Sequence, residues 1–92
     1  MIQSFREEDT RKVFAGERTK KFHQIRRVAE RRLMQLHAAE KLSDMQVPPG
    51  NSLEALKGDR EGQHSVRVND QYRLCFVWRG GHAYDVEITD YH

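Results

Sequence analysis

Three side chains that can carry protons stand in a row near the end of the sequence, Asp90, Tyr91 and His92. A carboxylate, a phenol and an imidazole can each give or take a proton, and a well-placed group of this kind contributes roughly 10²–10⁴-fold to a reaction rate. Of the histidines in the chain, His92 is the one that we expect to act. The tail therefore predicts acid–base chemistry, provided that the fold brings it to a substrate.

Two arginines predict an anion beside them. Arg67 and Arg73 fall on neighbouring strands of an expected hairpin, where like charges repel unless an anion lies between them. Asp85 and Glu87 on the next strand could be that anion, which would make a structural ladder of ion pairs. A bound phosphate is the other interpretation. The spacing favours neither.

The segment "LEALKGDREGQ", residues 53–63, adds Glu54, Lys57 and Arg60 and contains two glycines. Such a loop can lie across a sheet and bring its charges over the polar face. A connector that simply faces the solvent is the alternative. With the loop folded over the sheet, its lysine and acid would join the arginine pair.

The elements that would position these groups follow from the hydrophobic period. Residues 1–5 alternate like a short strand, and residues 7–16 begin with acids and end with glycine, as a short helix does. Residues 18–42 repeat apolar side chains every three or four positions, which predicts one long amphipathic helix. Two prolines and a glycine within residues 43–52 end that helix in a turn.

From residue 64 the period changes to two, which predicts strands at 64–68, 72–78 and 82–88. The apolar face of this sheet would pack on the helices. It is expected to hold Val66, Val68, Tyr72, Leu74, Phe76, Trp78, Tyr84, Val86 and Ile88. The fold class is α+β: one small domain over residues 1–92, with a short N-terminal strand, two helices and a three-stranded antiparallel meander.

The net charge of +2 hides a strong asymmetry. Residues 10–34 hold nine cations against two acids, a local charge of +7, so the rest of the chain carries −5. A face of this kind attracts polyanions, although an ordinary solvated helix face is the alternative. We expect a nucleic acid or an acidic protein to bind through the cations Lys20, Lys21, Arg26, Arg27, Arg31 and Arg32.

Composition sets the remaining limits. No apolar run approaches the ~20 residues that a membrane span needs, and no basic and apolar leader opens the chain. The single cysteine, Cys75, excludes an internal disulfide and a cysteine-based zinc site, and fits a reducing compartment. We expect a cytoplasmic protein that contacts no membrane and uses neither a metal nor another cofactor.

Three blocks of residues make the sequence similar to a known family. They are "LKGDR-G" at 56–62, "S-R-N-QYR" at 65–73 and the terminal "DYH", and their order and spacing match as well as their letters. With "MIQSF", the basic helix and the "PPGN" turn, the chain resembles the HigB family of bacterial toxins, within the RelE superfamily of ribosome-dependent mRNA interferases. The resemblance implies a RelE-like fold and an endoribonuclease that cuts mRNA in the ribosomal A site and so inhibits translation.

The same resemblance implies partners. Members bind the ribosome and its mRNA, and each is neutralised by an antitoxin from the neighbouring gene. In this family the antitoxin is a helix-turn-helix protein of the HigA kind, so operator DNA would be contacted indirectly, through the antitoxin.

Roles for single residues also follow from the resemblance. Lys57 and Arg73 match basic residues that hold the scissile phosphate, and Arg67 matches a third such residue. Well-studied members carry a histidine where this chain has Glu54, whereas other close members have glutamate. The catalytic tail of the family matches Asp90, Tyr91 and His92.

Metal-independent cleavage of RNA uses the 2′-OH of the substrate as nucleophile. It requires a base for that hydroxyl, charge relief at the phosphoryl oxygens and an acid for the departing 5′-oxygen. Our hypothesis is that His92 is the acid and Glu54 the base, with Tyr91 stacked on a nucleobase or steadying the leaving oxygen. The reverse assignment, with His92 as base, remains open. The alternative function is a non-catalytic or weakened RNA- and ribosome-binding module on the same fold.

Overall fold

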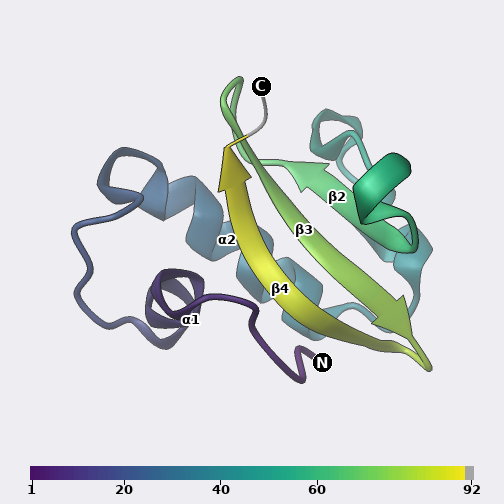
Figure 1. The fold of residues 1–92 in the computed structure, drawn as a ribbon, viewed down its shortest axis with the longest axis horizontal. Helices are drawn as coiled ribbons and strands as arrows, with labels where there is room; N and C mark the ends of the chain where they lie inside the picture. The colour runs from purple at the N-terminus through teal and green to yellow at the C-terminus, as the bar shows by residue number, and fades with distance from the viewer. Residues whose placement is uncertain (91–92) are drawn as a thin grey trace.

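The computed structural model describes residues 1–90 and shows the predicted α+β arrangement, with helix α2 behind an antiparallel sheet and helix α1 beside its last strand (Figure 1). The sheet order is β1-β2-β3-β4, and the strands span Glu54–Ala55, Gln63–Arg67, Tyr72–Arg79 and His82–Asp90. Helix α1 spans Glu8–Ala15 and α2 spans Arg26–Ala38. The short 3-10 turns are η1 His23–Ile25, η2 Leu42–Gln46, η3 Pro49–Asn51 and η4 Gly58–Arg60. The predicted meander is confirmed, and β1 adds a fourth strand where the sequence predicted a loop.

The predicted N-terminal strand is reduced to two parallel bridges, Ile2 to Ala83 and Phe5 to Val86. Helix α1 follows directly and is tied to the same strand by a hydroxyl, because Thr10 Oγ1 accepts the Ile88 N–H at 3.0 Å. The N-terminal segment and α1 therefore both lie along β4.

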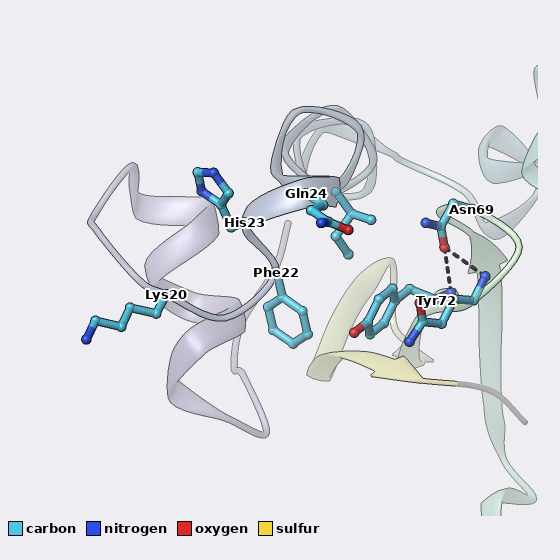
Figure 2. Close-up of a pocket in the computed structure, with 8 residues that line it drawn as sticks. Lys20, Phe22, His23, Gln24, Asn69 and Tyr72 are labelled. Carbon is cyan, nitrogen blue, oxygen red and sulfur yellow. Dashed lines mark hydrogen bonds between the residues drawn. The ribbon is translucent and has the colours of Figure 1, made fainter.

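Helix α2 is shorter than the sequence predicted at its N-terminal end. Phe22 adopts a left-handed backbone with φ of 66°, and its ring lies perpendicular to that of Tyr72 at 5.7 Å (Figure 2). The Thr19 hydroxyl donates to Asp9 at 2.5 Å and accepts the Lys21 N–H at 3.3 Å. These local side-chain bonds compete with helical hydrogen bonding, so the helix begins only at Arg26.

Helix α2 also ends before the predicted residue 42, because Asp44 binds backbone groups that follow the helix. Its carboxylate accepts the N–H groups of Glu40 and Lys41 at 2.9 and 3.1 Å. Those bonds lower the pKa of the Asp44 carboxyl below its usual value. Residues 39–42, which the apolar period assigned to the helix, therefore leave it after Ala38.

A bulge in β4 overturns one prediction for the apolar face. Between two successive pairs with β3, β4 contains one residue more than its neighbour, and Asp85 there has a φ of 52°. Ala83 consequently takes the buried position. Tyr84 turns to the polar face, where the Arg79 guanidinium carbon lies 4.6 Å from the centre of its ring.

The other predicted apolar residues pack as expected. Tyr72 and Trp78 are half-buried against the core, and the other six are buried within it, Val66, Val68, Leu74, Phe76, Val86 and Ile88. Helix α2 covers them with its own buried stripe, Ala29, Leu33 and Leu36. Over residues 1–90, neither helix has the length and apolar character that crossing a membrane would require.

Candidate active site

The polar face of the sheet is covered by the chain itself. Segment 56–63, here called the cover loop, leaves β1, passes through η4 and enters β2. Leu56 is buried, and its N–H donates to the Gln63 carbonyl at 2.9 Å, which closes the loop at its base. Ser65 and Cys75, two residues of the face expected to meet water, are fully buried.

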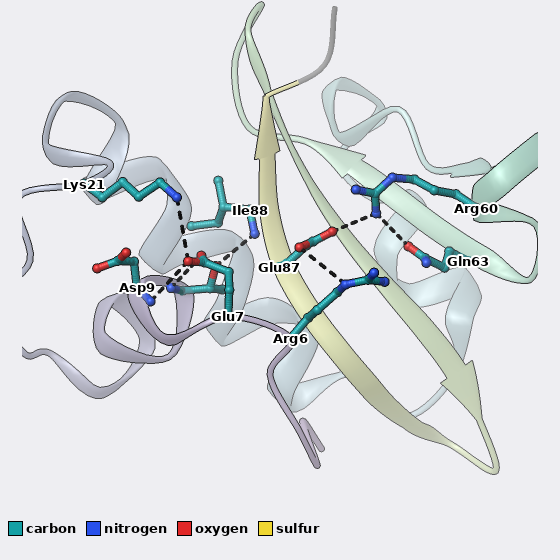
Figure 3. Close-up of polar contacts among 9 residues, drawn as sticks. Arg6, Glu7, Asp9, Lys21, Arg60, Gln63, Glu87 and Ile88 are labelled. Atoms are coloured by element: carbon teal, nitrogen blue, oxygen red, sulfur yellow. Dashed lines mark hydrogen bonds and ion pairs between the residues drawn. The ribbon is translucent and has the colours of Figure 1, made fainter.

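Arg60 reaches from the cover loop across the sheet to β4, which agrees with the interpretation that the charged loop lies over the polar face. Its Nη1 lies 2.8 Å from Glu87 Oε1 and donates to Gln63 Oε1 at 3.1 Å, and Arg6 approaches the same carboxylate at 3.9 Å (Figure 3). The Glu87 side chain is only 14% exposed. Glu87 therefore pairs with Arg60 and Arg6, not with the hairpin arginines, and that part of the ion-pair-ladder interpretation is wrong.

The Arg60–Glu87 ion pair can be tested through Cys75, whose burial raises the pKa of the thiol above its usual value. Neutralising one partner of a mostly buried ion pair leaves the other charge without its counter-charge, so Glu87→Gln should make local opening at least about tenfold more frequent. We expect a matching rise in the rate at which a thiol reagent labels Cys75 in the native protein. Glu61→Gln removes an exposed acid of the same loop and should leave the rate unchanged. Equal rates for both variants would mean that the ion pair does not hold the loop down.

Arg73 belongs to β3, and its guanidinium is held by acceptors of the protein itself. Its Nε donates to Ser65 Oγ at 2.7 Å and its Nη2 donates to the Ser52 carbonyl at 2.5 Å. Glu54 Oε2 is 3.8 Å from the same Nη2. The Arg73 side chain is 12% exposed and that of Glu54 is 55% exposed. The site thus contains a cation of fixed orientation beside a carboxylate that the solvent can reach.

Of the two remaining predicted cations, Arg67 lies beside Arg73 and Lys57 lies in the cover loop. Arg67 is the direct partner of Arg73 across the β2–β3 pair and makes an ion pair with Asp70. Lys57 is exposed and belongs to the cover loop, where its carbonyl accepts the Arg60 N–H at 3.4 Å. The pairing of Arg67 with Asp70 is local to the hairpin turn, and the sequence analysis did not anticipate it.

Asp90 is the last residue of β4, which extends two residues beyond the predicted strand. It pairs with Tyr72 across the sheet and its Oδ2 accepts from Gln71 Nε2 at 2.9 Å. Because side chains alternate along a strand, Asp90 shares the helix-side face with Ile88 and not the face of Arg73. The predicted residues Tyr91 and His92 lie outside the described residues.

A hollow of about 540 Å³ lies beside this end of the sheet (Figure 2). The hairpin residues Asn69, Gln71 and Tyr72 line one side, and Lys20 with residues 22–25 lines the other. Asn69 holds the hairpin turn, since its side-chain oxygen accepts the N–H groups of Gln71 and Tyr72 at 2.9 and 2.7 Å. The hydrogen bond from Gln71 to Asp90 joins the hollow to the end of β4.

The cations predicted to bind RNA do not form one stripe. Arg27 and Arg31 are exposed and stand one turn apart on the outer face of α2. Arg32 is half-buried on the flank of the helix and donates to the Arg67 carbonyl at 3.0 Å. Burial lowers the pKa of Arg32, and the neighbouring charges of Arg31 and Arg67 lower it further.

The other three cations precede the helix or begin it. Lys20 and Lys21 are exposed in the turn before η1, and Lys21 lies 3.9 Å from Glu7. Arg26 donates to the Glu17 carbonyl at 2.6 Å and lies 3.7 Å from Glu30. The prediction of a single basic helix face is therefore wrong, because the chain turns at Phe22.

Within residues 1–90, no three His, Cys, Asp or Glu side chains are grouped so that they could hold a metal ion. The polar face offers cations, a carboxylate and hydroxyl groups instead. That combination can bind a phosphate and move a proton next to it.

A family model for the "RelE-like toxin of type II toxin-antitoxin system HigB" matches residues 3–92. The chain belongs to this family of HigB-like toxins. The RelE-like fold predicted from the sequence is thereby confirmed.

Individual relatives agree with the family. Toxin HigB-1 of Vibrio cholerae serotype O1 is 51% identical over 53 residues, which is 58% of this chain and 56% of the relative. Endoribonuclease HigB of Proteus vulgaris is 45% identical over 40 residues, 44% of each chain. The matched stretches thus span about half the length of these relatives. A solved structure, the YoeB-YefM complex from Staphylococcus aureus, superposes with a TM-score of 0.62 at 16% identity and covers 100% of this chain and 98% of its own, which shows a shared fold.

Proposed function

We propose that this HigB-like chain is the toxin of a type II toxin–antitoxin system and acts in the cytoplasm as an endoribonuclease that cuts mRNA in the ribosomal A site. The observation that carries the proposal is Arg73, fixed by Ser65 and Ser52, beside the accessible carboxylate of Glu54. Family membership and the name of the P. vulgaris relative, an endoribonuclease, support it.

The proposed reaction needs no metal. The 2′-oxygen of the substrate attacks the adjacent phosphorus, and the bond from phosphorus to the 5′-oxygen breaks, which leaves a 2′,3′-cyclic phosphate and a 5′-hydroxyl. Negative charge grows on the phosphoryl oxygens during the attack. Arg73, together with Arg67 and Lys57, would stabilise that charge, and preorganised donors of this kind usually supply the largest protein contribution.

Proton transfer is assigned to Glu54 and the tail. Glu54 would take the proton of the 2′-OH, because its carboxylate is open to solvent next to the phosphate-binding arginine. His92 would give a proton to the departing 5′-oxygen, and Tyr91 would stack on a nucleobase or steady that oxygen. Asp90 would hold the end of β4 in place through its hydrogen bond with Gln71, and it would not contact the phosphate.

The proposal includes partners. The ribosome and mRNA supply the substrate, and a HigA-like helix-turn-helix antitoxin would neutralise the toxin and connect it indirectly to operator DNA. The S. aureus structure with the shared fold is itself a complex, of YoeB with YefM, which supports the expectation of an antitoxin. The basic residues Lys20, Lys21, Arg26, Arg27, Arg31 and Arg32 would contact ribosomal RNA, whose phosphates dominate affinity.

Primer extension on a translated mRNA after induced expression tests the proposal. We expect cuts inside the reading frame with the intact chain and none with a chain that lacks His92. A non-catalytic binding module would slow translation without cuts and would keep its effect after the deletion. Cuts that persist in the deleted chain would instead remove His92 from the mechanism.

A further inference from the structure

A second concave surface lies between α1 and the turn that leads into α2. Its volume is about 920 Å³. We call it the basic groove, because four of its lining side chains are cations, Lys12, Arg18, Lys20 and Arg26. Asp9, Thr19 and His23 complete the lining. Lys12 and Arg18 belong to the basic segment 10–34 but were not among the six cations predicted to bind RNA.

The cations that line the basic groove outnumber its acids. Asp9, its one acid, accepts the Thr19 hydroxyl at 2.5 Å. The ion pairs within residues 1–90 leave out Lys12, Arg18 and Lys20. Bringing like charges together on a concave surface costs stability and focuses a positive potential there. A bound polyanion would remove that cost.

One of the cations is held in place before any ligand arrives. Arg26 Nη2 donates to the Glu17 carbonyl at 2.6 Å, so the guanidinium is fixed against the loop that follows α1. By contrast, Arg27 and Arg31 stand on the convex outer face of α2. A sugar–phosphate backbone in the groove can contact several cations at once, whereas the outer face of α2 offers only Arg27 and Arg31.

The groove is separate from the candidate active site. Its lining comes from α1 and residues 18–26, with no contribution from β2, β3 or β4. Figure 1 shows α1 and this turn on one side of β4, and β2 on the other. An mRNA held at Arg73 would therefore leave the groove to a different RNA segment. The hollow beside the hairpin shares Lys20 and His23 with the groove and adds amide side chains that can hydrogen-bond to nucleotides.

We infer that the basic groove binds the sugar–phosphate backbone of ribosomal RNA and is the main electrostatic contact of this chain with the ribosome, an inference that rests on the proposed function. Lys12 and Arg18 are then binding residues, and Arg27 and Arg31 contribute less than the sequence suggested. The groove positions the toxin on the ribosome, and the sheet face around Arg73 performs the cleavage.

The test compares two double variants that remove the same charge, Lys12→Gln with Arg18→Gln and Arg27→Gln with Arg31→Gln. Binding to purified ribosomes without mRNA is measured over a range of KCl concentrations. Each phosphate contact contributes about 0.7–0.9 to the slope of log K against log salt, so the groove variant should lose roughly 1.5 in slope and bind at least about tenfold more weakly at 0.1 M salt. The variant with Arg27→Gln and Arg31→Gln should lose clearly less slope and less affinity for the ribosome. Thermal unfolding checks that both variants remain folded.

The outcomes separate this inference from the proposed function. At saturating ribosome concentration the groove variant should cut at the parental rate, whereas Arg73→Ala should bind ribosomes normally and fail to cut. Equal losses for the two double variants, or no loss for the groove variant, would overturn the groove assignment and leave cleavage at Arg73 unaffected. A loss seen only on ribosomes that carry mRNA would overturn the assignment to ribosomal RNA. If Arg73→Ala cuts normally, the proposed function fails, whatever the groove binds.

Discussion

Arg73→Ala should lower the single-turnover rate of mRNA cleavage on ribosomes by roughly 10²–10³-fold, the usual effect of removing one preorganised donor to a developing oxyanion. The reason is geometric. Ser65 and the Ser52 carbonyl fix the guanidinium before substrate binds, so no reorganisation is needed as charge develops. Ribosome binding should remain near the parental value, because the basic groove is untouched.

Arg79→Ala is the matched control, since Arg79 is an exposed arginine of the same strand that stacks on Tyr84. It removes the same charge and should cut at the parental rate. Arg73→Lys separates charge from geometry, because a lysine cannot make both hydrogen bonds of the arginine fork. Rapid cleavage by a folded Arg73→Ala protein would end the assignment of this face as the active site.

Glu54→Gln should lower the cleavage rate by about 10²–10⁴-fold, the contribution expected of a general base. It should also abolish the rise of rate with pH on the acid side of the profile, since glutamine cannot accept the proton of the 2′-OH. The substitution keeps the size of the side chain, and Glu54 is more than half exposed, so stability should change little.

His92→Gln provides the complementary profile. If His92 is the acid, this variant should lose the fall of rate at high pH and retain the rise at low pH. The opposite pattern would exchange the two roles. Glu61→Gln, which neutralises an exposed acid of the cover loop, should leave the profile unchanged. Parental rates for both Glu54→Gln and His92→Gln would remove both residues from the mechanism.

The sequence predicted the sheet well, because strands with one buried face show a clear period of two. Leu74 and Phe76 are buried as that period required, and Arg67 and Arg73 pair across the hairpin. Of the two interpretations of the charged loop, the one that places it across the polar face agrees with the position of Arg60. These features follow from alternation and from turn residues, which are local in sequence.

Features that depend on the balance of competing hydrogen bonds were not predictable in this way. The bulge at Asp85 moves Tyr84 to the other face and Ala83 into the core, although the apolar letters alone favour the tyrosine. The left-handed backbone at Phe22 divides an apolar stripe that reads as continuous. As a result Lys20 belongs to a groove and not to a helix face. The pairing of Glu87 with Arg60 depends on how the cover loop crosses the sheet, and the spacing of residues in the sequence does not predict that path.

The N-terminal segment has a consequence for how this chain can associate with others. The outward backbone groups of β4 are already bonded: Ala83 and Val86 exchange hydrogen bonds with residues 1–6, and the Ile88 N–H is taken by Thr10. Within residues 1–90 this border of the sheet offers little template for an added strand, and the opposite border is the two-residue β1. An antitoxin, or a second copy of the chain, should therefore dock by packing side chains and not by extending the sheet.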